Sequence, residues 1–140
     1  MKEPLGYKIH EINKLFKNRI KSEANKIGIN STYMFIFHFL AKNKDLDITQ
    51  SDIADNVCLK APTVSLTLQN MEQEGLLIRE KSLSDCRKTF VRLTDKGIEM
   101  DNKLKEIHEK LENEMKEVLK DNLYLFIESL DKIKNVIKED

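Results

Sequence analysis

A segment near the middle of the chain places hydroxyl and amide side chains on one side of a predicted helix, residues 62–74. The other side of this helix is apolar and carries Val64, Leu68 and Met71. Hydroxyls and amides can hydrogen-bond to DNA base edges and phosphates, and short side chains let a helix approach a groove closely. The same positions could equally be solvated ones on a surface helix. The candidate DNA-contacting residues of this segment are Lys60, Pro62, Thr63, Ser65, Leu66, Gln69 and Asn70.

A second charged group lies at the tip of a predicted β-hairpin. Strand-like runs at 76–81 and 89–94 flank a polar segment in which Asp85 and Arg87 are two residues apart. An arginine at an exposed tip can enter the minor groove of DNA, where negative potential is highest, and a nearby carboxylate can orient its guanidinium. The alternative is an ordinary surface ion pair, worth under about 1 kcal/mol. Two further candidate contacts flank the pair, Lys81 and Lys88.

The two cysteines offer redox chemistry. Cys86 lies between Asp85 and Arg87, and adjacent positive charge favours the thiolate form that oxidants attack. A redox switch at Cys86 is therefore one hypothesis, and Cys58, in the turn between two short predicted helices, is a weaker candidate. We expect neither to form a disulfide, because the sequence lacks the apolar core of a secretion signal and indicates a reducing, cytoplasmic setting.

Catalysis and metal binding have little support in the sequence. His10, His38 and His108 belong to three different predicted helices, and no pair has the i, i+4 spacing of a helical zinc site. His38 lies inside an apolar run, where a hydrogen-bonded core histidine is expected. Since the sequence also lacks a Gly-rich phosphate loop, a nucleophile elbow and a paired His/Cys arrangement, we expect no metal, no cofactor and no enzyme.

Apolar spacing predicts the elements that position these residues. Apolar positions recur at steps of three and four from residue 5 to Gly28, which predicts a long amphipathic helix. The run 33–40 is apolar on every side and is expected to cross the core. A short helix begins at Thr49, which stands in capping-box spacing with Asp52, and the helix at 62–74 ends at Gly75.

The hairpin at 76–94 directly follows this pair of short helices. Thr94 can cap a next helix with coiled-coil-like apolar spacing from 104 to 118, and a last helix covers 123–137. The fold class is therefore mainly α with a small β-hairpin, a winged helix-turn-helix. In that arrangement the second short helix enters a major groove and the hairpin reaches the flanking backbone.

The length of the chain indicates one domain, and its charge is unevenly distributed. The chain has 140 residues and a formal net charge of zero. Residues 1–30 carry seven Lys/Arg against three Asp/Glu, and residues 99–140 carry eight against twelve, so positive charge is concentrated away from the C-terminal third. No apolar run approaches the roughly 20 residues that span a bilayer, so we expect no membrane partner.

The stretch 48–97 resembles the multiple antibiotic resistance regulator (MarR) family. The resemblance rests on three motifs, which close the second short helix, form the wing tip and start the next helix. They are Met71-Glu72-Gln73-Glu74-Gly75-Leu76, Asp85-Cys86-Arg87 and Leu93-Thr94-Asp95-Lys96-Gly97. Many family members carry a further Asp and Arg in the wing where this chain has Ser82 and Ser84.

The resemblance implies a homodimeric transcriptional regulator, most commonly a repressor, that binds a pseudo-palindromic operator. Residues 30–97 would form the DNA-binding lobe, and 1–29 and 98–140 the dimerisation helices. Relatives often bind a small aromatic effector in a cleft between these parts. The residues that could line such a cleft here are Tyr33, Met34, Phe37 and His38. A different class, a winged-helix dimer that binds another protein, is the alternative, and the Asp85/Arg87 pair with the polar helix face argues against it.

Overall fold

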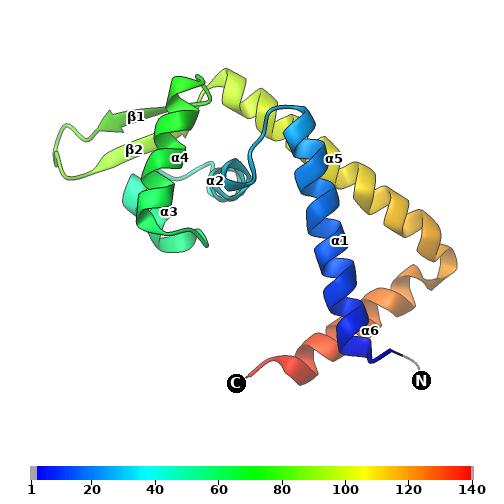
Figure 1. Ribbon diagram of the computed structural model, residues 1–140. Helices are drawn as coiled ribbons and strands as arrows, with labels where there is room; N and C mark the ends of the chain where they lie inside the picture. Colours follow the sequence, from blue (N-terminus) through cyan, green and yellow to red (C-terminus); the bar gives the residue numbers. More distant parts are fainter. Residues whose placement is uncertain (1–2, 140) are drawn as a thin grey trace. The chain divides into compact units, whose positions relative to one another are not determined.

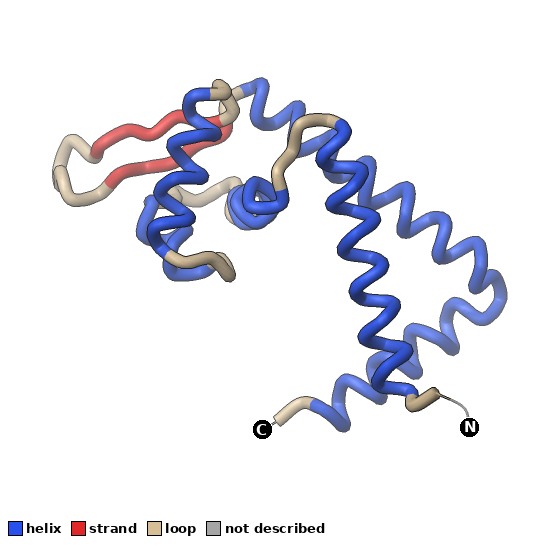
Figure 2. The backbone as a smooth tube through the Cα atoms, in the orientation of Figure 1, coloured by secondary structure: helices blue, strands red, loops and turns tan. Residues whose placement is uncertain are grey.

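A computed structural model describes residues 3–139 (Figure 1). The chain divides into two compact units within one long helix, the first ending at Ile107 and the second beginning at His108. Figure 2 shows that helices dominate and that the only strands among the described residues form one hairpin. The elements are α1 (Leu5–Lys26), α2 (Ser31–Lys42), α3 (Gln50–Asn56), α4 (Ala61–Gln73), β1 (Leu77–Lys81), β2 (Thr89–Leu93), α5 (Asp95–Leu119), the 3-10 turn η1 (Lys120–Asn122) and α6 (Leu123–Ile137). The predicted fold class is confirmed.

Local side-chain chemistry sets the helix boundaries much as predicted. Gly28 takes a left-handed φ of 80° two residues after the end of α1, and the Asn30 side chain caps α2 by accepting from the Thr32 backbone N–H at 3.0 Å. At α3 both halves of the capping box form: Asp52 N–H donates to Thr49 Oγ1 at 3.1 Å, and Thr49 N–H donates to Asp52 Oδ2 at 2.9 Å. The capping-box prediction is confirmed.

The hairpin pairs β1 and β2 antiparallel, with Leu77 opposite Leu93 and Lys81 opposite Thr89. A third segment extends it, because the Val91 N–H donates to the Ile48 carbonyl at 2.8 Å and Thr49 forms an isolated bridge with Phe90. The chain before α3 therefore lies along the outer edge of β2. This pairing ties the start of the helix pair to the wing.

The core of the first unit lies between α2, α4 and the hairpin. Its fully buried side chains include Ile36 and Phe37 from α2 and Leu68 and Met71 from α4, and Leu104 of α5 joins the same cluster. The start of α5 is therefore part of the first compact unit.

Two expectations for α2 are wrong. Phe35 and His38 are exposed, so the helix is not apolar-buried on every side and His38 is not a core histidine. The physical reason is the size of the lobe: α2 buries only the stripe at i, i+3, i+4 and i+7, which here is Tyr33, Ile36, Phe37 and Leu40.

The second unit contains the rest of α5, η1 and α6. Lys120 turns the chain between the two helices with a positive φ of 46°. The unit leaves a large apolar surface in water, since α6 has no buried residue although Phe126, Ile127 and Leu130 recur at helical spacing. Among the described residues no helix is both long and apolar enough to cross a membrane.

Candidate nucleic-acid interface

Helix α4 separates its side chains into a buried and an exposed face. Val64, Leu68 and Met71 are buried, as predicted. On the opposite face the predicted contacts are exposed, except that Thr63 is half-buried. The exposed ones are Lys60, Pro62, Ser65, Leu66, Gln69 and Asn70. The helix therefore presents hydroxyl and amide groups on a surface held rigid from behind, which suits a helix that reads a groove.

The C-terminal end of α4 is held by the start of α5. Gly75 ends the helix with a φ of 75°, and the Leu76 N–H returns to the Met71 carbonyl at 2.9 Å. Lys96 Nζ donates to the Glu74 carbonyl at 2.7 Å, and the Thr94 hydroxyl donates to the Gly75 carbonyl. Carbonyls that a helix end leaves unpaired are thus satisfied by the next helix, which fixes α4 relative to α5.

Arg79 of β1 joins three elements of the interface. Its guanidinium donates to both carboxylate oxygens of Glu72 on α4, at 3.0 and 3.3 Å, and to Gln50 Oε1 on α3 at 3.4 Å. The hydrogen bond from Arg79 lowers the pKa of Glu72 from its ordinary value of 4.5. Sequence reasoning missed this residue. The alternation of exposed and inward residues along β1 was a signal, but its partners lie 7 and 29 residues away.

We expect Arg79→Met to lower the free energy of unfolding at pH 7 by under about 1 kcal/mol, since the pair is partly exposed and screened by water. A carboxyl whose folded pKa is lowered adds stability above its unfolded pKa, here 4.5, and loses it as pH falls through the folded pKa. Urea unfolding should therefore show the variant and the parent converging below pH 4.5. A difference that stayed constant from pH 7 to pH 3 would contradict the assignment.

The wing tip is built by two side chains that accept backbone hydrogen bonds. Ser82 Oγ accepts from the Asp85 N–H at 3.2 Å and from the Ser84 N–H at 3.3 Å, and Asp85 Oδ1 accepts from the Arg87 N–H at 3.0 Å. Ser82 and Asp85 thus shape the tip of the wing. The turn-forming hydroxyl of Ser82 is a signal that sequence reasoning could have used.

Arg87 projects from this tip almost entirely into solvent. Its side chain is 94% exposed, and its Nε lies 3.7 Å from Asp85 Oδ1. Lys81 and Lys88 are exposed on either side of the tip, and Asp85 is half-buried. The tip therefore carries three exposed cations and one carboxylate, which stabilises the turn by accepting a backbone hydrogen bond.

The other predicted sites are dispersed. Tyr33 and Phe37 are buried in the core and Met34 packs against it, while His38 is exposed. Burial and the neighbouring carboxylate of Glu74 raise the pKa of Tyr33. Cys58 and Cys86 are both exposed, and they are not joined in a disulfide. In the described part of the chain no three His, Cys, Asp or Glu side chains are grouped closely enough to hold a metal ion.

Comparison with known proteins decides the family. Residues 15–104 match the family described as "Transcriptional regulator SarA/Rot". The chain belongs to the SarA/Rot family of transcriptional regulators. This family is MarR-like and winged-helix, so the predicted MarR resemblance is confirmed.

Two relatives are named as transcriptional regulators, and solved structures share the fold of this chain. The HTH-type transcriptional regulator MhqR of Bacillus subtilis is 30% identical over 73% of this chain and 69% of its own length. FarR of Neisseria gonorrhoeae is 31% identical over 71% of this chain and 72% of its length. The structure of MepR, described as a regulator of the Staphylococcus aureus multidrug efflux pump MepA, is 21% identical and matches with a TM-score of 0.90 over 97% of this chain and 100% of that one. A MepR–DNA complex matches with a TM-score of 0.75.

Proposed function

We propose that this SarA/Rot regulator is a cytoplasmic repressor that binds a pseudo-palindromic operator as a homodimer. The carrying observation is the exposed face of α4, where Ser65, Gln69 and Asn70 lie opposite a fully buried stripe. In this proposal α4 enters the major groove, and Arg87 reaches the adjacent minor groove from the wing. Transcriptional regulation is already indicated by the family, whereas the sign of regulation and the operator are the proposal.

The apolar faces outside the DNA-binding lobe support a dimer. On α1, Leu5, Ile12 and Leu15 are each about three-fifths exposed, and on α6 Tyr124 and Leu125 are exposed. A monomer gains nothing from leaving so much apolar surface in water, and a second copy of the chain offers the same surface to cover it. In such a dimer the two α4 helices would meet successive major grooves about 34 Å apart.

Release from DNA by a small aromatic effector is a further part of the proposal. Tyr33, Met34, Phe37 and His38 remain its predicted contacts, although Tyr33 and Phe37 are core residues in the isolated chain. A second copy of the chain would be needed to complete such a cleft.

We expect the protein to shift a duplex that contains its own upstream region, with affinity falling steeply as salt rises, because phosphate contacts release counterions. Arg87→Ala combined with Ser65→Ala should weaken binding by about tenfold or more, and the loss of one cation from each protomer, two in the dimer, should reduce the salt slope by about 2. Fluorescence anisotropy at several salt concentrations measures both quantities.

Lys132→Ala is the matched control, since it removes one exposed cation from α6, outside the proposed contact surface. Unchanged sub-micromolar binding by the Arg87/Ser65 double variant would exclude the proposed contact surface. Selection of bound DNA from a random pool tests the dimer separately, because a homodimer should recover two half-sites one helical turn apart.

A further inference from the structure

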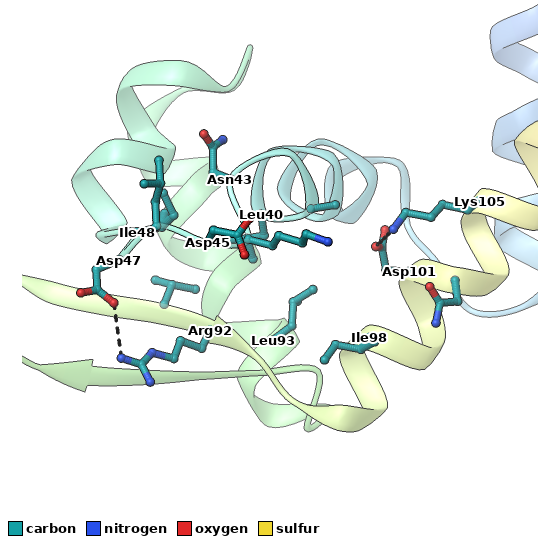
Figure 3. Close-up of a pocket in the computed structure, with 15 residues that line it drawn as sticks. Leu40, Asn43, Asp45, Asp47, Ile48, Arg92, Leu93, Ile98, Asp101 and Lys105 are labelled. Atoms are coloured by element: carbon teal, nitrogen blue, oxygen red, sulfur yellow. Dashed lines mark hydrogen bonds and ion pairs between the residues drawn. The ribbon is translucent and has the colours of Figure 1, made fainter.

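A hollow in the first unit lies away from the exposed face of α4. It has a volume of about 630 Å³ and is walled by the end of α2, the loop before α3, β2 and the start of α5 (Figure 3). This volume is in the range of small-molecule sites in proteins. Apolar residues from each of these walls supply its non-polar surface, among them Leu40, Ile48, Leu93 and Ile98.

One charged group in the lining is taken out of water. The Asp101 side chain is only 9% exposed, and its Oδ2 lies 3.1 Å from Lys105 Nζ one turn further along α5. Lys105 is itself 57% exposed, so the ammonium that pairs with Asp101 stands at the solvent side of the hollow. Figure 3 shows both side chains projecting from α5 toward the other lining residues.

The charges in the lining favour a cation over an anion. The lining holds three cations, Lys44, Arg92 and Lys105, and all three are exposed, so water already screens them. Asp101 is the one buried charge, and a charge in a low-dielectric place gains most from an added partner. A long lysine side chain can swing into solvent at little cost and leave that carboxylate to a ligand.

We propose that this hollow binds a small organic cation with an apolar body, whose ammonium group replaces Lys105 as the partner of Asp101. The body would lie against Leu40, Leu93 and Ile98. The site goes beyond the proposed function, since it is distinct from the predicted effector residues and its occupancy can be measured without DNA. Whether a ligand bound in this hollow changes DNA binding is the one part that rests on the proposed function.

The test uses three probes of one shape and different charge: 4-phenylbutylamine, protonated at pH 7, its neutral analogue 4-phenylbutanol and the anion 4-phenylbutyrate. Ligand-observed NMR titration of the full chain should show the amine binding about tenfold more tightly than the alcohol, and the anion most weakly. Equal affinity of the amine and the alcohol would overturn the proposal.

Two variants with opposite expected effects localise the site. Asp101→Asn should remove the preference for the amine, whereas Lys105→Ala should strengthen amine binding several-fold by removing the competing ammonium. If the two residues form only a helix-surface ion pair, Lys105→Ala changes nothing, which would refute the proposal even if Asp101→Asn failed to fold. Asp45→Asn is the control, because it removes an exposed carboxylate from the same hollow. Loss of the preference in that variant would overturn the assignment to Asp101.

DNA binding by the same preparations separates the two proposals. Parent protein that shifts its operator duplex but shows no preference for the amine would refute the cation site alone. Protein that binds the amine as expected but no operator would refute the proposed function alone.

Discussion

Gly97→Ala should lower the free energy of unfolding by about 3 kcal/mol, at the high end of what overpacking costs. A Cβ at position 97 would lie 1.9 Å from the Leu76 carbonyl oxygen and 2.9 Å from the Leu76 carbonyl carbon. Both are backbone atoms, so no side-chain rotation relieves the overlap and the start of α5 must move. For a chain of this size the melting temperature should fall by about 10 °C. Thermal unfolding followed by circular dichroism at a fixed protein concentration measures the loss.

Movement of α5 away from Leu76 would also loosen the end of α4. Lys96 and Thr94, which hold the Glu74 and Gly75 carbonyls, are the neighbours of the displaced residue. We therefore expect Gly97→Ala to weaken DNA binding even at temperatures where the variant remains folded. Gly6→Ala is the matched control, because a Cβ there meets nothing within 4 Å and alanine favours a helix. A melting temperature for Gly97→Ala equal to that of Gly6→Ala would contradict the close approach.

Leu68→Ala should cost about 3 kcal/mol of folding stability. The Leu68 side chain is 0% exposed and packs in the core behind the proposed DNA-contacting face. Removing a buried leucine loses its transfer free energy and leaves a cavity that a close-packed core fills only partly. Urea unfolding should show the loss as a lower midpoint with an unchanged slope.

Leu66→Ala is the same change two residues earlier on the same helix. It should leave folding stability almost unchanged and weaken DNA binding instead. Leu66 is 57% exposed, so its truncation should change the unfolding free energy by less than about 0.5 kcal/mol. If α4 enters a major groove, Leu66→Ala should instead weaken operator binding by about fivefold, because apolar side chains there contact thymine methyl groups. A Leu66→Ala protein that bound DNA normally but lost stability would contradict the assignment of Leu66 to the exposed, DNA-contacting face of α4.

Local patterns determined most of the secondary structure. The capping box at Thr49 and Asp52, the glycines at 28 and 75 and the apolar stripe of α4 each act within a few residues, so the sequence alone was enough to place them. The polar face of α4 followed from the same short-range periodicity, and the exposure of Arg87 followed from its place at the tip of the predicted hairpin. The family motifs then connected these features to DNA.

Tertiary structure alone decided how these elements are held together. The Arg79 guanidinium joins residues 50, 72 and 79, Ile48 pairs with Val91, and Gly97 packs on Leu76. Such contacts depend on which segments pack together in the folded chain. Composition and periodicity describe only neighbouring residues, so they do not predict these long-range contacts. The same limit explains the error at His38, since an apolar run shows that a helix is buried but not which side of it the small lobe leaves uncovered. The place of Asp101 could not be predicted for the same reason, because the hollow that it lines is shared with residues of α2, the following loop and β2.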